Sequence, residues 1–588
     1  MKTVTMTSFV NKRLNERNLD IHWLPHSVGC LITYAKRNSY VNNNYIFKTP
    51  LYDPLEYQTY YDTLLDTDIL CLTNYVWNQK YNDGISKYYK SIRPDGLVIY
   101  GGASVPEHKD YAEKYAQERP FVDLFFVGPG ELTLTNFLQN IDADITTHEG
   151  AFGRGFNNVV VDKSLYLIPE EQIPSPYTDG IFDDIINSIT DKRIGITFET
   201  TRGCPFRCSF CDWGGLSRSL VSKLPTADIY NTIDWIYSHG DKIAIVDIID
   251  ANFGMIKRDL EVLQYFEKLQ IETGHKIKVT VNGFVKNGSP YLKDTILTLN
   301  RLSGYSKNAM LSFQTHSENA LVAIDRDNIR NEKLYPLIKE LQDEGLCIKS
   351  EMILGLPGET LTDYIKTLET DYKLGIFSMR AYPLIVIVNT PMYDTEYRLK
   401  HGVKIKKILI PHDLLLTRKQ YTENTNKTTD CDFTDDSLYE ESEVMYECNS
   451  FSNDEFIEIL KRWWWYHNFY NLGTIRNEIK NMYDSGVSIS EQINMFFNMV
   501  YSGSMPVLNK ILNIYEDAVR ELYAPEPVSK IKSANAVNFF QKGMRTYEPT
   551  YFIDNSEEVK HELELIYTTV DNSHWKNRIA VALDDTIS

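Results

Sequence analysis

Three cysteines stand within eight residues of the segment Thr200–Gly215, as Cys204, Cys208 and Cys211 in the spacing C-x3-C-x2-C. Thiolates this close together on one loop can ligate a single iron–sulfur cluster. A structural zinc site needs four ligands, and the nearest histidine downstream is His239. A cubane cluster held by three thiolates keeps one iron open to bind and cleave a small molecule. The spacing therefore favours such a cluster over three buried thiols or a zinc site completed by a distant ligand.

The region around the cysteines, residues 191–400, repeats strand and then helix, with helices expected at Asp259–Ile271 and Glu332–Glu344. Six such units predict a partial TIM-type barrel of parallel strands. The cysteine segment follows the first strand, and functional side chains are expected at the C-terminal strand ends. The expected strands are Ile194–Glu199, Ile243–Ile248, Ile277–Val281, Ala309–Gln314, Ile348–Leu354 and Leu384–Val388.

Residues 1–145 show a second α/β pattern, with buried strands expected at Ile69–Leu72, Leu97–Tyr100 and Leu124–Val127 and a helix at Gly84–Ile92. The last two strands end in glycine turns, Gly101-Gly102 and Gly128-Pro129-Gly130-Glu131. Strand, glycine turn and helix in this order predict a doubly wound, Rossmann-like parallel sheet. Ligands bind such sheets at the carboxyl ends of the strands, where both turns fall.

The remaining regions are predicted to be a linker, residues 146–190, and a mostly helical domain, residues 401–588. The linker contains the proline-rich segment Ile173–Tyr177, which cannot continue a helix. Helices are expected at Phe456–Tyr470 and Ile489–Tyr501. The three tryptophans Trp463–Trp465 favour a buried helix over a lid or substrate-pocket wall. Residues 428–460 hold eleven acidic residues and no Lys or Arg, which indicates a solvated loop or acidic face.

Composition excludes several classes of protein. The 588 residues carry 61 basic and 80 acidic side chains, and the resulting net charge of −19 disfavours nucleic-acid binding. Apolar runs fall short of the ~20 residues that span a bilayer, so we expect no membrane association. The N-terminus lacks an apolar block, and eight cysteines are too few for a disulfide scaffold. A cytoplasmic protein is expected.

The segment Thr200–Gly215, with the aromatic Phe210 before the last cysteine, resembles the radical S-adenosylmethionine (radical SAM) enzymes. The resemblance implies that Cys204, Cys208 and Cys211 hold a 4Fe-4S cluster whose open iron chelates SAM. One electron then cleaves SAM to methionine and a 5′-deoxyadenosyl radical. Each further SAM contact, taken alone, fits a polar core group or a turn equally well. The SAM contacts that the resemblance implies are Phe210, Asp250, Asn252, Ser312, Gln314, Glu351 and Gly355.

The N-terminal region resembles the cobalamin-binding domain of cobalamin-dependent radical SAM enzymes, and together with the barrel the resemblance covers about residues 20–400. The motif Asp-x-His-x-x-Gly is absent, so we expect no histidine on cobalt and instead a large side chain near Tyr75–Asn78 covering the lower face. The alternative is a flavodoxin-like module without a cofactor. The implied cobalamin contacts are Tyr75, Val76, Trp77, Asn78, Gly101, Gly102, Ser104, Val105, Gly128, Gly130 and Glu131.

The resemblance implies an enzyme, most simply a C-methyltransferase that moves a methyl group from methylcobalamin to an unactivated carbon. An alternative keeps both cofactors but catalyses a rearrangement or cyclisation without methylation. A third is a non-catalytic iron–sulfur or zinc binding protein. The implied partners are a small-molecule or peptide substrate and an electron donor such as flavodoxin or ferredoxin. The sequence assigns no catalytic side chain.

Overall fold

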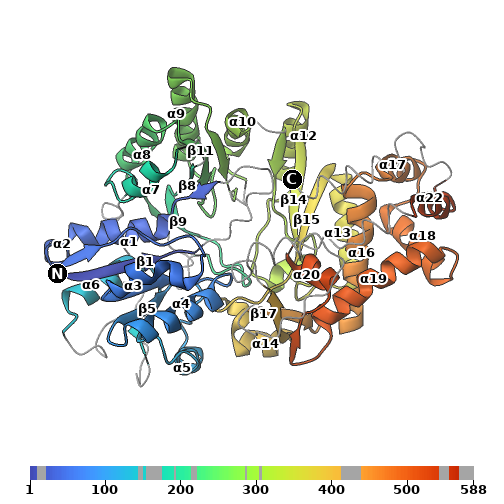
Figure 1. Cartoon of the computed structure of the whole chain (residues 1–588). Coiled ribbons are helices and arrows are strands. Elements are labelled where there is room, and N and C mark those ends of the chain that lie inside the picture. The colour runs from blue at the N-terminus through green and yellow to red at the C-terminus, as the bar shows by residue number, and fades with distance from the viewer. Residues whose placement is uncertain are drawn as a thin grey trace.

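The computed structural model describes residues 1–9, 21–142, 150–153, 175–190, 194–213, 221–281, 283–284, 288–303, 307–411, 439–541 and 555–567 (Figure 1). It is an α/β protein with several sheets and a helix-rich C-terminal region. The N-terminal sheet lies at the lower left of Figure 1, the sheet that contains β8 lies above it, and the C-terminal helices lie at the right.

The N-terminal sheet has six strands in the order β3-β1-β4-β5-β6-β7, all parallel except β7. The three strands predicted in this region are present as β4, β5 and β6, and the structure adds the others. Their bounds are β1 (Lys2–Thr7), β3 (Tyr45–Phe47), β4 (Ile69–Thr73), β5 (Leu97–Gly101), β6 (Leu124–Phe126) and β7 (Ala151–Phe152).

Helices cover both faces of this sheet, because side chains along a strand point alternately to its two faces. In β4, Ile69 and Cys71 pack into one core and Leu70 and Leu72 into another. The first core contains side chains of α1 and α6, and the second contains side chains of α3, α4 and α5. The helix bounds are α1 (His26–Arg37), α2 (Ser39–Asn44), η2 (Tyr57–Tyr60), α3 (Tyr61–Leu65), α4 (Gln79–Ile92), α5 (Lys109–Gln117) and α6 (Gly130–Gln139).

The middle region forms two parallel sheets, in the orders β12-β11-β8-β2 and β13-β14-β15. The strand β2 belongs to the N-terminal segment and pairs with β8, which joins the first two regions through backbone hydrogen bonds. Isoleucines of β8 and β11 are buried against α8 and α9 in one core. The strand bounds are β2 (His22–Trp23), β8 (Ile194–Phe198), β9 (Thr201–Gly203), β10 (Val221–Lys223), β11 (Ile243–Ile248), β12 (Lys278–Val281), β13 (Asn308–Met310), β14 (Cys347–Leu354) and β15 (Ile376–Pro383).

The expected strand at Leu384–Val388 is wrong. The strand of this region is β15 (Ile376–Pro383), and the segment after it makes only a single bridge, between Ile385 and Val444. In β15 buried residues are interspersed with exposed ones, so its sequence lacks the continuous apolar run from which the later segment was chosen. The other helices here are α7 (Asp183–Ser188), α8 (Thr226–Ser238), α9 (Lys257–Thr273), α10 (Leu292–Ser303), α11 (Glu318–Ala323), α12 (Asn331–Asp343), α13 (Leu361–Lys373), η7 (Pro391–Tyr393) and α14 (Thr395–His401).

The C-terminal region is mostly helical, and it also contains an unexpected three-stranded sheet in the order β17-β16-β18. Trp463, Trp464 and Trp465 are all buried in one large core, which confirms the buried helix. The bounds are β16 (Lys404–Pro411), β17 (Tyr439–Glu447), α16 (Asn453–Trp465), the π-helix η9 (Tyr466–Asn471), α17 (Arg476–Asp484), α18 (Ile489–Tyr501), α19 (Pro506–Tyr523), β18 (Val528–Lys530), α20 (Ala534–Gln541) and α22 (Ser556–Glu564).

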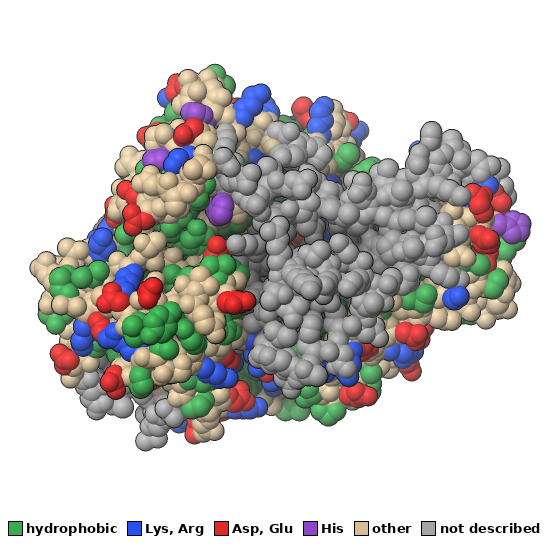
Figure 2. Space-filling model, viewed as in Figure 1, with side chains coloured by type: hydrophobic (Ala, Val, Ile, Leu, Met, Phe, Trp, Pro, Cys, Tyr) green, Lys and Arg blue, Asp and Glu red, His purple; other side chains and the backbone are tan. Residues whose placement is uncertain are grey.

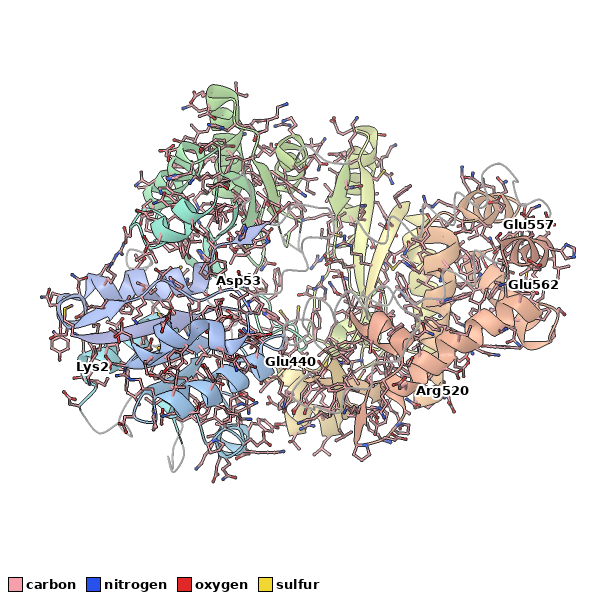
Figure 3. The ribbon with its side chains drawn as sticks, viewed as in Figure 1. Lys2, Asp53, Glu440, Arg520, Glu557 and Glu562 are labelled. Carbon is pink, nitrogen blue, oxygen red and sulfur yellow. The ribbon has the colours of Figure 1, made fainter. Side chains whose placement is uncertain are left out.

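The acidic stretch is only partly described, since residues 428–438 lie outside the described residues. The described part is no solvated loop, because it forms β17 and the start of α16. Glu440 accepts a 2.8 Å hydrogen bond from the backbone N–H of Lys80, and Glu441 pairs with Lys80 and Lys407. These contacts join β17 to α4, and Glu440 is labelled at this junction in Figure 3.

The visible face of the molecule carries acidic and basic side chains interspersed over the N-terminal sheet and its helices (Figure 2). Among the described residues, no helix combines the length and apolar character that a bilayer-spanning segment requires. Ile173 and Pro174 of the expected linker lie outside the described residues, whereas Tyr177 is buried.

Candidate functional site

The cysteine loop begins where β8 ends, and Asp250 holds it in place from the end of β11. The Asp250 carboxylate accepts hydrogen bonds from the backbone N–H groups of Thr200 (2.7 Å) and Thr201 (3.0 Å) and from both threonine hydroxyls. Burial raises the pKa of Asp250 to about 7, and these donors oppose the rise. Asp250 therefore fixes the backbone just before the cysteines.

Each cysteine sulfur has an N–H group near it. The Asn252 side-chain amide lies 3.0 Å from Cys204 Sγ, the Arg326 guanidinium 3.8 Å from Cys208 Sγ, and the Trp213 backbone N–H 3.4 Å from Cys211 Sγ. Cys204 and Cys208 are buried and Cys211 is half-buried. Asn252, like Asp250, was predicted as a SAM contact, and in this structure both residues contact the cysteine loop itself.

The Arg326 guanidinium lies beside one of the loop cysteines, Cys208. Burial lowers the pKa of Arg326, and interactions with Cys208, Cys211 and Cys204 all oppose this shift. The sequence analysis missed Arg326, whose guanidinium lies 3.8 Å from Cys208 Sγ. Arg326 stands between two aspartates in the connection from α11 to α12, and no motif marks it.

The donors beside the cysteine sulfurs bear on which group this loop can hold. Within the part of the chain that the structure describes, no three His, Cys, Asp or Glu side chains are grouped closely enough to hold one metal ion, and this includes the three loop cysteines. Three thiols with N–H groups beside their sulfurs suit the larger iron–sulfur cubane, whose sulfurs accept hydrogen bonds.

Three of the predicted SAM contacts meet where β13 ends beside the middle of β14. Ser312 donates its hydroxyl to the Glu351 carboxylate at 3.1 Å, and the Gln314 backbone N–H donates to the Glu351 carbonyl at 2.9 Å. The second bond continues the parallel pairing of the two strands, and Gln314 has a positive φ of 69°. The polar groups of Ser312 and Glu351 therefore face each other beyond the last residue pairs of β13 and β14.

Gly355 and Phe210 contact the C-terminal core. Gly355 has a φ of +85°, and a Cβ there would lie 2.6 Å from the ring of Phe456 in α16. A side chain at position 355 would thus collide with Phe456, which packs directly against the backbone of Gly355. Phe210 is half-buried and packs against the same core, which connects the cysteine loop to α16 and its neighbours.

A cavity of about 370 Å³ lies between the carboxyl ends of the N-terminal strands and the cysteine loop. This volume is within the range of small-molecule sites. Of the predicted cobalamin contacts, those that line the cavity are Tyr75, Gly101, Gly102, Gly128, Gly130 and Glu131. From the cysteine loop, Arg202, Gly203, Asp212 and Trp213 line it as well.

The other five predicted cobalamin contacts do not line this cavity: Val76, Trp77, Asn78, Ser104 and Val105. Asn78 instead accepts the Tyr75 N–H at 2.8 Å and donates to the Thr73 carbonyl at 3.1 Å, so it shapes the turn. Trp77 is 40% exposed and stacks on Tyr75 with ring centroids 4.7 Å apart. The large side chain that reaches the cavity from this turn is therefore Tyr75.

Charged residues on the cavity wall were also missed from the sequence. Arg202 donates to Glu131 at 2.7 Å and to Glu199 at 2.9 Å. Near them, burial lowers the pKa of His26 to about 4, and its Nε2 lies 3.6 Å from Sγ of Cys30. Of these contacts, the one between Arg202 and Glu131 joins segments 71 residues apart, which spacing along the chain does not reveal.

Comparisons with known proteins agree with this geometry. The model of the radical SAM superfamily matches residues 198–370. The cobalamin-dependent radical SAM methyltransferase TokK of Streptomyces tokunonensis is 29% identical, over 74% of this chain and 62% of its own length. A 2-(S-pantetheinyl)-carbapenam-3-carboxylate methyltransferase of Streptantibioticus cattleyicolor is 27% identical over the same shares. The chain thus matches less than two thirds of either relative.

The same fold occurs in a solved structure of OxsB, a cobalamin-dependent SAM radical enzyme with aqua-cobalamin and SAM bound. That structure aligns with a TM-score of 0.54 at 14% identity, covering 100% of this chain and 84% of OxsB. Residues 198–370, which include the cysteine loop, thus match the radical SAM superfamily, and the chain is similar to a cobalamin-dependent member of it.

Proposed function

We propose that this protein is a cobalamin-dependent radical SAM enzyme that methylates an unactivated carbon of its substrate. The observation that carries the proposal is the cavity lined both by the glycine turns of the N-terminal sheet and by the cysteine loop. A corrinoid in this cavity would lie beside the cluster site, as methyl transfer to a carbon radical requires. The relationship to TokK supports the same activity.

The proposed domains follow the chain. Residues 1–145 form a Rossmann-like cobalamin-binding domain, residues 146–190 a linker, residues 191–400 a partial radical SAM barrel and residues 401–588 a cap that shapes the substrate pocket. The parallel sheet with helices on both faces supports the first assignment. The two parallel sheets around the cysteine loop support the barrel.

The cofactors, when bound, supply radical hydrogen abstraction through the cluster and SAM and a transferable methyl group through cobalamin. Cys204, Cys208 and Cys211 hold the cluster in this proposal, and Asp250 fixes the backbone that presents them. Ser312, just after β13, and Glu351, within β14, offer polar groups to SAM. Tyr75 and the glycine turns bound the corrinoid side of the cavity.

The proposed substrate is a small molecule, because one relative is named for methylating a carbapenam carboxylate. An external one-electron donor such as flavodoxin or ferredoxin completes the reaction. We propose a cytoplasmic location, because a reducing compartment keeps cluster thiols reduced.

Anaerobically purified protein, supplied with cobalamin, SAM carrying a deuterated methyl group and a reductant, tests the proposal. We expect 5′-deoxyadenosine to form and the labelled methyl group to appear in the product when a suitable small molecule is present. Cleavage of SAM without label transfer would support a rearrangement or cyclisation instead. Absence of SAM cleavage by cluster-loaded protein would contradict the proposed enzyme.

A further inference from the structure

The guanidinium of Arg326 is held against the cysteine site by three separate contacts. Its Nη1 lies 3.8 Å from Cys208 Sγ, its Nε donates to the Asn328 side chain at 2.9 Å, and its Nη2 donates to the Ser312 carbonyl. Arg326 is only 5% exposed. The side chain is therefore fixed in place, with one N–H group aimed at a cysteine sulfur.

A buried cation of this kind is costly unless a negative charge compensates for it. The thiolate of Cys208, 3.8 Å from Nη1, would supply such a charge. A cluster held by three thiolates would bring further negative charge to the same place. The positive charge of Arg326 would therefore be compensated when the cysteines hold the cluster.

The other side-chain donor at the cysteines is neutral. Asn252 is 5% exposed, and its amide nitrogen lies 3.0 Å from Cys204 Sγ. Hydrogen bonds to cluster sulfurs and nearby positive charge both stabilise the reduced form of a cluster, which carries one more electron than the oxidised form. Arg326 supplies both a hydrogen bond and a positive charge, whereas Asn252 supplies a hydrogen bond alone.

We propose that Arg326 is a positioning residue that sets the reduction potential of the cluster by donating to Cys208 and placing a positive charge beside its thiolate. The inference rests on the proposed function, since it requires the cluster. It makes one-electron reduction of the cluster by the external donor easier. Asn252 acts in the same direction with a smaller effect.

The test is a redox titration of anaerobically reconstituted full-length protein with dithionite, followed by electron paramagnetic resonance of the reduced cluster. We expect Arg326→Gln to shift the midpoint potential to a more negative value. Arg326→Lys should shift it less, because lysine keeps the positive charge but lacks the planar guanidinium group. Asn252→Ala should shift it in the same direction. Arg330→Gln is the matched control, because it removes an exposed arginine nearby.

A midpoint potential of Arg326→Gln equal to that of the wild type and of Arg330→Gln would overturn the inference and leave the proposed function intact. If Arg326→Gln binds no iron, the midpoint potential of Arg326→Lys is compared with those of the wild type and Arg330→Gln instead. If both variants fold like the control by circular dichroism yet hold no cluster, Arg326 is needed for assembly and the tuning role is wrong. A wild type without a cluster would instead refute the proposed function.

Discussion

Arg202 Nη1 donates a 2.7 Å hydrogen bond to Glu131 Oε1, and this ion pair joins the cysteine loop to the start of α6. Arg202 lies two residues before Cys204, and Glu131 follows the turn Gly128–Gly130. The pair therefore connects the proposed cluster site directly to the proposed corrinoid cavity. Its Glu131 side chain is 6% exposed, so solvent screens the pair only partly.

The coupling between Arg202 and Glu131 is measurable. We expect Arg202→Met and Glu131→Gln each to lower the free energy of unfolding, with a coupling energy of about 0.5–3 kcal/mol in the double-mutant cycle. Urea denaturation of the four proteins measures this. The same variants should retain less cobalamin after gel filtration. Strictly additive effects together with unchanged cobalamin retention would show that the pair does not shape the cavity.

The three loop cysteines are expected to be individually essential for cluster assembly. Alanine at Cys204, Cys208 or Cys211 removes one of only three thiolate ligands, so bound iron and sulfide should fall to a small fraction of the wild-type content. Chemical analysis of anaerobically reconstituted protein measures both. Cys347→Ala, on β14, is the control and should keep the wild-type content. Full iron content in any loop variant would contradict the three-thiolate site.

Glu440, which lies where β17 meets α4, should make the stability of the protein depend on pH. Burial raises its pKa from 4.5 to about 8, so the folded state favours the protonated form. Its contribution is fully present below the unfolded pKa of about 4.5 and is lost as the pH rises through about 8. Glu440→Gln keeps an acceptor for Lys80 and cannot ionise. We expect this variant to gain stability relative to the wild type as the pH rises from about 5 to about 9, by urea denaturation.

The neighbouring Glu441 provides a control, because its pKa is shifted in the opposite direction. Despite the opposing effect of burial, hydrogen bonds and charge from Lys407 and Lys80 lower its pKa to about 2. Its stabilising contribution is present above the unfolded pKa and is lost as the pH falls from about 4.5 through about 2. Glu441→Gln should therefore lose stability relative to the wild type near neutral pH and less so in acid. If the stability of both variants, relative to the wild type, changed with pH in the same way, the opposite pKa shifts of Glu440 and Glu441 would be wrong.

Gly355 should be required for packing against α16. Because a Cβ would meet the Phe456 ring at 2.6 Å and φ is +85°, we expect Gly355→Ala to cost about 1–3 kcal/mol of unfolding free energy. Gly274→Ala, where φ is +74° and no atom lies within 4 Å, isolates the backbone strain and should cost less. Thermal unfolding compares them. Equal losses in the two variants would show that contact with Phe456 contributes nothing.

The sequence predicted most central strands and marked the cysteine loop as the candidate site, because these are local signals. The spacing of Cys204, Cys208 and Cys211 and the apolar runs of β4, β5 and β11 are visible in short windows. The strand β15 was missed because Ser378 and Arg380 interrupt its apolar residues, so it shows no continuous apolar run. Arg202 and Arg326 were missed because each acts through partners far away in the sequence. Such partners become apparent only when the sheets are assembled.

The most direct measurement is the electron paramagnetic resonance spectrum of the anaerobic, dithionite-reduced protein before and after addition of SAM. A three-thiolate cubane leaves one iron open, so we expect about four iron and about four sulfide per chain and a reduced-cluster signal that changes when SAM binds. A cluster signal that SAM leaves unaltered, or protein that binds zinc through a fourth side chain instead of iron, would contradict the open-iron site.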